Sequence, residues 1–257
     1  MKDITIGIIG GTGGMGRWFA YLLKKEGHTV HVSGRKTKLS SDELAKICNV
    51  VVVSVPISAT ADVIKQVGPL LDRDKLFMDL TSLKKEPVKL MLANSRAEVI
   101  GCHPLFGPGV EDALGENVIL CPARGQKWLG WLRNILEKSG MVITEETPEK
   151  HDEMMVIVQV LNHLNTISLG LALAGSSVSL EELSKYSTPI FQTKIGIIKK
   201  VFTESPGLYA DIIANNPDTD KILNLYEKSL TNIRQLLKYD DSVHLKNALA
   251  QTGNKLF

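Results

Sequence analysis

The segment VIGCHPLFGPG, residues 99–109, ends an apolar run on the ionisable side chain of His103. A neutral imidazole can accept a proton near pH 7, so a histidine at the mouth of a strand is a candidate general base. Pro104 disfavours helical backbone angles at His103 and favours extended ones, which restricts where the ring can point. A strand-end histidine is more often structural, so the segment alone leaves both roles open.

A second candidate site is the glycine-rich loop GGTGGMG, in which Gly11, Gly13 and Gly16 match G-x-G-x-x-G. The first glycine of this motif permits a tight turn, and the second lets the backbone approach a pyrophosphate. The third glycine lets the following helix pack closely against the preceding strand, and the N-terminus of that helix attracts phosphate. Because the loop joins a strand pattern to a helix pattern, dinucleotide binding is favoured over a merely structural turn. The predicted cofactor-binding residues here are Gly11, Thr12, Gly13, Gly14, Met15, Gly16, Ser54, Val55 and Pro56.

The end of the second strand, VHVSGRKTK, indicates which dinucleotide binds. An NAD site needs a carboxylate at this place for the ribose hydroxyls, and the segment has none. Hydrogen-bond donors and positive charge stand there instead, on Ser33, Arg35, Lys36 and Thr37. They suit a ribose 2′-phosphate, because guanidinium binds phosphate through two parallel hydrogen bonds. We predict NADP as the cofactor, with NAD less favoured; a solvated basic loop is the alternative.

Strand and helix patterns alternate in the first half of the chain. Strands are predicted over 4–10, 28–34, 50–56, 75–82 and 97–104, and helices over 17–27, 40–49, 58–71 and 85–95. This order predicts an α/β fold with a parallel, doubly wound sheet of the Rossmann type. Later patterns are all helical, over 149–174, 179–187, 189–204, 206–214, 219–238 and 240–256. We expect a dinucleotide-binding domain at 1–150 and a helical domain at 151–257, with a ligand cleft between them.

The bulk composition of the 257 residues is that of a soluble globular protein, with 44% hydrophobic and 23% charged residues. A net charge of +2 gives no reason to expect a nucleic-acid partner. No apolar run reaches about 18 residues and no signal peptide is visible, so neither a membrane span nor secretion is expected. Cys48, Cys102 and Cys121 form no C-x-x-C pair and fit reduced thiols in a cytoplasmic protein. No metal site is predicted.

The helix predicted from residue 149 is apolar nearly all round, so we expect it to be buried. Asp152, Gln159 and His163 nevertheless share one face of it at about 100° per residue. Polar groups inside a buried helix need hydrogen-bond partners, either in a structural network or in a ligand.

Several stretches together resemble the prephenate dehydrogenase family, which includes arogenate and cyclohexadienyl dehydrogenases. In order along nearly the whole chain they are GGTGGMGRWFA, VVVSVPISAT, MDLTSLKKEP, GCHPLFGPG, EKHDEMMVIVQVLNHL, STPIF and SPGLYADI. The resemblance implies oxidation of prephenate or arogenate, with hydride transfer to the nicotinamide and loss of the ring carboxylate as carbon dioxide. The products are 4-hydroxyphenylpyruvate or tyrosine, made for tyrosine biosynthesis.

The resemblance also implies the catalytic residues. His103 matches the family's catalytic histidine, and Ser82 matches a serine that bonds both the substrate hydroxyl and that histidine. Taken alone, Ser82 reads as the N-cap of the following helix, and the two roles can coexist. Lys84 could touch cofactor or substrate, or be an ordinary solvated lysine.

Five further residues are candidates for substrate binding, with Lys199 as an alternative to one of them. His163 matches a histidine that helps to bind substrate, and His151 is either a cleft residue or part of a helix start. Lys200 stands where the family usually has a carboxylate-binding arginine, so the charge is kept but the bidentate fork is lost. Lys199 could share that role, and Gln192 replaces another arginine of some relatives. Tyr209 matches an aromatic residue that reaches the neighbouring subunit, which implies a homodimer formed through the helical domain.

Two other readings stay open. One is another two-domain, NADP-dependent reductase of small acids or imines, which would share the glycine loop but lack the HPLFGP, HD and helix-histidine set. The other is a catalytically silent NADP-binding regulatory protein on the same fold, against which His103 and Ser82 argue.

Overall fold

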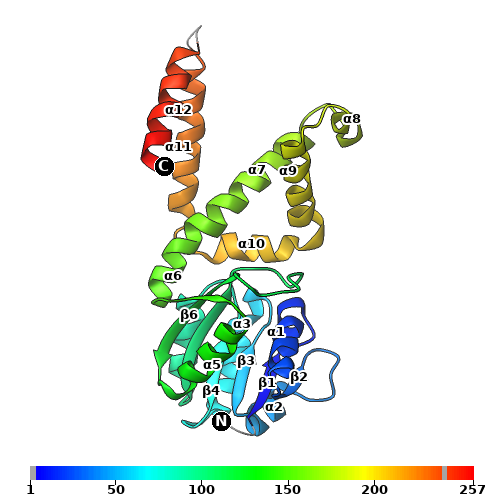
Figure 1. The fold of residues 1–257 in the computed structure, drawn as a ribbon, viewed down its shortest axis with the longest axis vertical. Coiled ribbons are helices and arrows are strands. Elements are labelled where there is room, and N and C mark those ends of the chain that lie inside the picture. Colours follow the sequence, from blue (N-terminus) through cyan, green and yellow to red (C-terminus); the bar gives the residue numbers. More distant parts are fainter. Residues whose placement is uncertain (1–3, 239–241) are drawn as a thin grey trace. The chain divides into compact units, whose positions relative to one another are not determined.

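The computed structural model describes residues 4–238 and 242–257 and divides them into two units (Figure 1). The first unit runs up to Met155 and also includes Gly207–Ile212; the second comprises Val156–Pro206 and Ile213–Phe257. The division falls inside the helical segment that begins at Pro148, close to the domain boundary expected at residue 150.

The first unit is built on one seven-stranded sheet with the order β2-β1-β3-β4-β5-β6-β7. The strands are Thr5–Ile9 (β1), Thr29–Ser33 (β2), Val50–Val53 (β3), Leu76–Asp79 (β4), Glu98–Pro104 (β5), Asn117–Arg124 (β6) and Val142–Glu145 (β7). Every neighbouring pair is parallel except β5 and β6. The Rossmann-type α/β fold is confirmed, and the five predicted strands, β1 to β5, are parallel. The sequence did not predict β6 and β7, and β6 adds the antiparallel pairing with β5.

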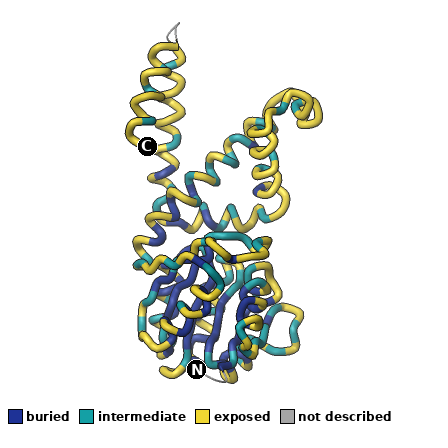
Figure 2. The backbone as a smooth tube through the Cα atoms, viewed as in Figure 1, coloured by how far each residue is buried: buried dark blue, intermediate teal, exposed yellow. Residues whose placement is uncertain are grey.

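Helices cover both faces of the sheet, which explains its continuous apolar strands. On one face, Ile8, Val52 and Ile100 share a core with α1 (Gly14–Lys25) and α5 (Lys127–Lys138). Ile9, Val53 and Val99 point to the other face. They share a second core with α2 (Ser41–Ile47), α3 (Ile57–Val67) and α4 (Lys85–Asn94). A short 3₁₀ turn, Gly68–Leu70 (η1), follows α3. Figure 2 shows the strands as the most buried part of the unit.

The strand order creates a switch point between β1 and β3, where the connections leave in opposite directions. Open α/β sheets bind ligands outside the carboxyl ends of the strands at such a point. The glycine loop follows β1 there, and the segment Ser54–Pro56 follows β3. The ends of β4 and β5 bring Asp79 and His103 to the same edge.

The second unit is all helical in the part that the structure describes. Its elements are η2 (Val156–Leu161), α7 (Asn162–Ala174), α8 (Leu180–Ser184), α9 (Pro189–Lys199), η3 (Lys200–Glu204), α11 (Thr219–Leu236) and α12 (Val243–Leu256). The helix α10 (Pro206–Asn215) belongs partly to each unit. Both η2 and η3 are π-helical turns. The helix expected over 240–256 begins at Val243, and residues 240 and 241 lie outside the described residues.

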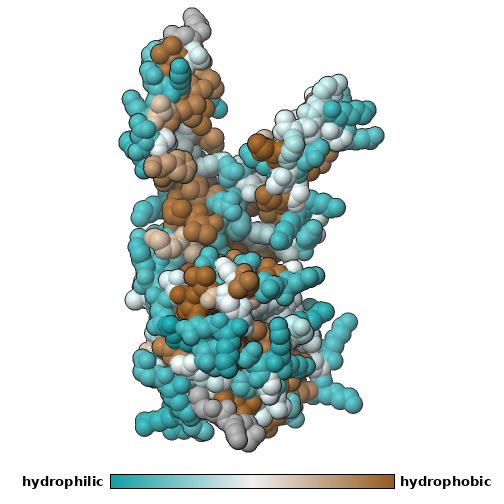
Figure 3. All heavy atoms as spheres, in the orientation of Figure 1, coloured by the Kyte–Doolittle hydropathy of each residue, from teal (hydrophilic) through white to brown (hydrophobic). Residues whose placement is uncertain are grey.

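The helical segment α6 (Pro148–Met155), η2 and α7 does not have the burial expected of it. Only 17% of its most apolar 18-residue window is buried, with Ile157 48% and Leu171 60% exposed. The window has a mean hydropathy of 1.5, so this 27-residue segment meets the length and composition requirements of a membrane span, contrary to the sequence expectation. Polar residues such as Gln159 and Asn162 interrupt the apolar run, which is why no long run is visible in the sequence. The mean hydropathy of the window stays high because the residues between them are apolar. Figure 3 shows apolar side chains gathered along the helices of this unit.

Candidate active site

The glycine loop turns at Gly10, one residue before the predicted position. Gly10 has a φ of +81°, a left-handed conformation that favours glycine, and a Cβ there would lie 2.1 Å from the carbonyl oxygen of Ser54. Gly11, to which the tight turn was assigned, has the different task of leaving room for Val32, which a Cβ would approach to 2.6 Å. The doubled glycine was the only sequence signal for Gly10.

The rest of the loop forms a cradle that fits a pyrophosphate. A Cβ on Gly16 would lie 2.5 Å from the carbonyl oxygen of Gly10, so only glycine lets α1 start this close to β1. Gly13 is the N-cap of α1, and no side chain caps the helix. The first turn contains no acidic residue. Uncapped N–H groups at a helix N-terminus attract phosphate, so these residues fit the phosphates of a dinucleotide.

The basic loop after β2 divides into residues that shape it and residues that are exposed. Ser33 is buried and its Oγ lies 3.2 Å from that of Ser41. The Thr37 hydroxyl accepts a hydrogen bond from the Gly34 amide at 2.8 Å. These two predicted phosphate donors are therefore occupied within the loop. Arg35 and Lys36 are exposed and keep their charges available to a ligand.

His103 stands at the end of β5 in a chain of hydrogen bonds. It is 4% exposed, and its Nδ1 lies 2.8 Å from Nε2 of His151. The Nδ1 of His151 lies 2.7 Å from Oδ1 of Asp152. The two rings meet edge to face, with centroids 5.0 Å apart. His151 and Asp152 come from α6, so the first helix after the sheet completes the site.

The carboxylate of Asp152 fixes the direction of this chain. A carboxylate can only accept, so the neutral His151 ring carries its proton on Nδ1 and accepts at Nε2. His103 must then donate from its own Nδ1, which leaves a lone pair on Nε2. In the part of the chain that the structure describes, that Nε2 has no hydrogen-bond partner. The geometry therefore presents one unprotonated imidazole nitrogen to a substrate.

The charge states agree with this assignment. Burial lowers the pKa of His103 well below its ordinary value, and nearby His151 and Lys84 lower it further. Burial also lowers the pKa of His151, against the opposing effect of Asp152. Burial alone would raise the pKa of Asp152. Its hydrogen bonds, from His151 and from backbone N–H groups, outweigh that effect and lower the pKa. At neutral pH both imidazoles are neutral and the carboxylate is charged.

This arrangement changes the role of His151. Its side chain is fully buried and both ring nitrogens are engaged, so it has no free nitrogen with which to bind substrate. The sequence prediction of a substrate contact at His151 is corrected to the positioning of His103. The sequence places His151 and Asp152 at the start of a helix but gives no signal of their contact with His103.

Asp152 also caps α4, the helix that follows β4. Its Oδ1 accepts from the Lys84 amide at 2.8 Å, and its Oδ2 accepts from the Lys85 amide at 3.0 Å. The N-cap residue is Lys84 and not Ser82, so the capping alternative for Ser82 is wrong. Ser82 is half-buried, and its hydroxyl has no hydrogen bond among the described residues, including none to His103. Lys84 is fully buried, which excludes the solvated alternative.

The remaining predicted residues lie on helices after α6. His163 is half-buried on α7, where burial lowers its pKa, while Gln192 on α9 and Lys200 at the start of η3 are exposed. All three belong to the second unit, whereas Tyr209, half-buried on α10, belongs to the first.

Asp152, Gln159 and His163 were expected to share one face of a regular α-helix. The π-helical turn η2 lies between Asp152 and His163 and has more residues per turn, so the rotation of about 100° per residue that placed them on one face does not hold there. Gln159 Oε1 is buried without a hydrogen-bond partner in the described part of the chain.

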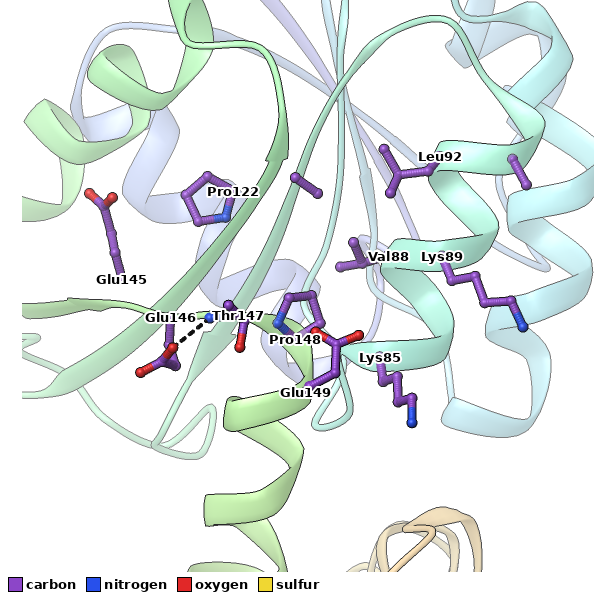
Figure 4. A pocket seen from close by; sticks show the side chains of 12 residues that line it. Lys85, Val88, Lys89, Leu92, Pro122, Glu145, Glu146, Thr147, Pro148 and Glu149 are labelled. Atoms are coloured by element: carbon purple, nitrogen blue, oxygen red, sulfur yellow. Dashed lines mark hydrogen bonds between the residues drawn. The ribbon is translucent and has the colours of Figure 1, made fainter.

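A cavity of about 920 Å³ in the first unit lies apart from this chemistry (Figure 4). Lys85 and Lys89 extend from α4 on one side of it, and Glu149 stands at the start of α6 on the other. None of the predicted catalytic or cofactor-binding residues lines it. Among residues 4–238 and 242–257, no three His, Cys, Asp or Glu side chains are arranged to hold a metal ion.

Comparison with known proteins matches two family models to this chain. The model described as "Prephenate dehydrogenase, nucleotide-binding domain" matches residues 19–145. The model described as "Prephenate dehydrogenase, dimerization domain" matches residues 147–251. The glycine loop lies just ahead of the first match.

Curated proteins give the same family, and a solved structure shows the same fold. A probable arogenate/prephenate dehydrogenase of Methanocaldococcus jannaschii is 37% identical, over 93% of this chain and 58% of that protein. The T-protein of Enterobacter agglomerans is 32% identical, over 91% of this chain and 62% of that protein. The chain therefore spans about three fifths of the length of these relatives. A crystal structure of prephenate dehydrogenase from A. aeolicus has a TM-score of 0.81 at 22% identity, covering 99% of this chain and 98% of that one.

Proposed function

The chain belongs to the prephenate dehydrogenase family, and we propose that it oxidises and decarboxylates prephenate or arogenate for tyrosine biosynthesis. The observation that carries this proposal is the His103–His151–Asp152 chain, which leaves Nε2 of His103 as a proton acceptor at the carboxyl edge of the sheet. A non-catalytic nucleotide-binding protein has no need of an imidazole held in one tautomer by a buried carboxylate.

In this reaction the ring hydroxyl of the substrate gives its proton to Nε2 of His103. The hydride leaves the ring carbon that carries this hydroxyl, and the nicotinamide cofactor, when bound, supplies its acceptor. The bond to the ring carboxylate then breaks and carbon dioxide departs. Its electron pair makes the ring aromatic, and the ring oxygen takes the proton back from His103 as the phenol forms. Asp152 stabilises the arrangement while positive charge is shared by the two imidazoles.

We assign substrate-binding roles to residues that the geometry does not exclude. Ser82, half-buried at the edge that holds His103, is suited to bond the substrate hydroxyl because its own hydroxyl is not engaged. His163 and Gln192 offer polar contacts, and Lys200 offers a positive charge for a carboxylate. Tyr209 is the residue that we assign to the neighbouring subunit's site.

We propose NADP as the preferred cofactor. The support is the exposed pair Arg35 and Lys36, and the absence of a carboxylate from the loop of residues 34–40 that joins β2 to α2. The A. aeolicus structure, in contrast, is of a complex with NAD+ and hydroxyphenyl propionate. A residue that accepts from ribose hydroxyls would favour NAD, whereas two free cations favour the 2′-phosphate.

We further propose a homodimer in the cytoplasm. The matched dimerisation model covers residues 147–251, the region that carries exposed apolar side chains such as Ile157, Leu171 and Leu225. A second copy would cover these side chains, so lipid is not needed to explain the apolar helix that begins at Pro148.

Purified protein assayed with prephenate and arogenate, each against NADP and NAD, tests the proposal. We expect turnover with at least one substrate, higher kcat/KM with NADP, and collapse of turnover in His103→Asn with unchanged cofactor binding. Turnover with neither substrate would overturn the assigned reaction. Equal or better use of NAD would overturn the cofactor assignment alone.

A further inference from the structure

Lys84 is a buried ammonium that the proposed reaction does not use. Its side chain is fully buried, and Nζ forms an ion pair with Oδ2 of Asp79 and donates to the carbonyl oxygen of Cys102 at 3.1 Å. The Thr81 hydroxyl lies 3.4 Å from the same nitrogen. A charge is costly to bury, so a fully enclosed lysine requires partners of this kind.

The fold makes room for this side chain at a specific place. Gly101 lies in the middle of β5, and a Cβ there would come within 2.8 Å of Cδ of Lys84. The lysine stem therefore crosses β5 at the one residue that has no side chain to oppose it. A glycine inside a buried strand is otherwise unfavourable, so its presence fits a requirement for this close approach.

The contacts of Lys84 form a closed ring with the candidate base. The ammonium holds the carbonyl oxygen of Cys102, the residue before His103. His103 bonds His151, His151 bonds Asp152, and Asp152 accepts from the backbone N–H of Lys84 itself at 2.8 Å. One residue thus binds the strand end that carries His103 and also the carboxylate that orients it.

From this closed set of contacts we infer that Lys84 is a positioning residue for His103. Lys84 holds the end of β5 and the carboxylate of Asp152 in place, and its positive charge lies beside the imidazole of His103. The inference rests on the proposed function only in taking proton acceptance as the task of His103. Its physical content, the effect of Lys84 on the ring, can be measured without turnover.

The charge effect has a definite sign. The groups that act on His103 are His151 from α6, which is hydrogen-bonded to it, and Lys84 from the start of α4. Asp152 bonds His151, and Asp79 from β4 pairs with Lys84. The thiols of Cys102 and Cys121 lie on β5 and on the neighbouring strand β6. Burial raises the pKa of each thiol to about 12, so both stay neutral. Positive charge on Lys84 lowers the pKa of His103. Removing that charge should therefore raise the pH at which His103 loses its proton.

The test replaces the ion pair as a unit, because Lys84→Met alone would leave the Asp79 carboxylate buried and unpaired. The double variant Asp79→Asn with Lys84→Met keeps the volume and removes both charges. If it does not fold, Asp79→Asn with Lys84→Gln offers two amides that can bond each other. Lys89→Met, on the exposed side of α4, is the matched control for loss of a lysine charge.

The readouts are the pH profile of kcat/KM and the titration of the His103 ring by long-range ¹H–¹⁵N NMR, assigned with His103→Asn. Asp79 carries the opposite charge, so its removal offsets part of the effect of removing the Lys84 charge, which lowers the pKa of His103. In the double variant we therefore expect the acid limb and the ring titration to move up together by about half a pH unit. We also expect kcat to fall at least about tenfold and cofactor affinity to stay within about twofold. Lys89→Met should leave the acid limb in place.

A fall in activity or thermal stability with no movement of the acid limb or of the His103 titration would overturn the inference. Loss of a lysine that only stabilises the fold would lower stability and activity but leave the titration of His103 unchanged. Failure of the proposed function gives a different result. The parent would then turn over neither substrate, while the NMR titration would still report whether Lys84 acts on His103.

Discussion

The indole nitrogen of Trp18 donates a hydrogen bond to the carbonyl oxygen of Val110 at 2.9 Å. The same indole meets the ring of Phe106 edge to face, with centroids 4.8 Å apart. Trp18 is on α1, directly after the glycine loop, whereas Phe106 and Val110 follow His103. These contacts hold the loop after the candidate base against the helix that begins at the candidate cofactor site.

Trp18→Phe should weaken cofactor binding more than it slows chemistry. The variant keeps an aromatic ring beside Phe106 but leaves the Val110 carbonyl oxygen without its donor, which costs about 1 kcal/mol. We expect KM for the cofactor to rise about three- to tenfold, while kcat changes less than about twofold. Tyr21→Phe, at an exposed position on the same helix, is the control. A lower kcat with unchanged cofactor KM would show that the contact does not support the cofactor site.

Asp152→Asn should abolish the proposed activity while leaving the protein folded. The amide nitrogen can donate to Nδ1 of His151, which would favour the wrong tautomer and remove the acceptor for Nδ1–H of His103. We expect kcat to fall by about 10²-fold or more, with substrate KM within about threefold. Loss of the α4 cap should cost about 1 kcal/mol in the free energy of unfolding, measured by urea denaturation.

Glu153→Gln is the matched control for that variant, because Glu153 is the next residue and pairs with Lys150 at the surface. A kcat in Asp152→Asn equal to that of the control would mean that the tautomer of His151 does not matter for turnover.

Much of the first unit could be predicted from sequence because its strands are short apolar runs with helices on both faces. β1, β3, β4 and β5 have this pattern, but β6 contains Pro122 and β7 is largely exposed, so the antiparallel end of the sheet was missed. The helix predicted from residue 149 was expected to be buried, but most of its apolar surface is exposed in a single chain.

The sequence predicts His103 in the candidate site but not the residues that position it. His103 could be found from its position at a strand end and its motif, but its contact with His151 joins residues 48 positions apart and depends on the completed fold. Lys84 reads as an ordinary helix-start lysine in the sequence. Only Gly101, a glycine inside an apolar strand, hints that a side chain crosses there.

The stability of the protein should fall as the solution becomes acidic. Burial lowers the pKa of both His103 and His151, whereas in the unfolded chain each titrates near pH 6.5. Below about pH 6.5 the unfolded chain binds more protons than the folded one, so stability rises with pH in that window. We expect the free energy of unfolding to drop by up to about 1.4 kcal/mol per pH unit for each histidine between about pH 6.5 and 5.

Urea denaturation at several pH values measures this dependence, and His103→Asn should show a shallower one than the parent. The denaturant m-value must stay constant for the comparison to hold. An identical pH dependence in parent and variant would mean that His103 is not held neutral by the fold.

Lys200 is exposed at the start of η3 and carries the positive charge that we assign to binding a substrate carboxylate. Lys200→Ala should raise substrate KM about tenfold or more and change kcat less than about threefold, since a contact present in both ground and transition states affects binding alone. Lys200→Arg should keep KM low, because guanidinium can bind a carboxylate through two bonds. Lys194→Ala on α9 is the exposed control. If Lys199→Ala raises KM and Lys200→Ala does not, the carboxylate is bound by the neighbouring lysine; a fall in kcat with unchanged KM in Lys200→Ala would contradict a binding role.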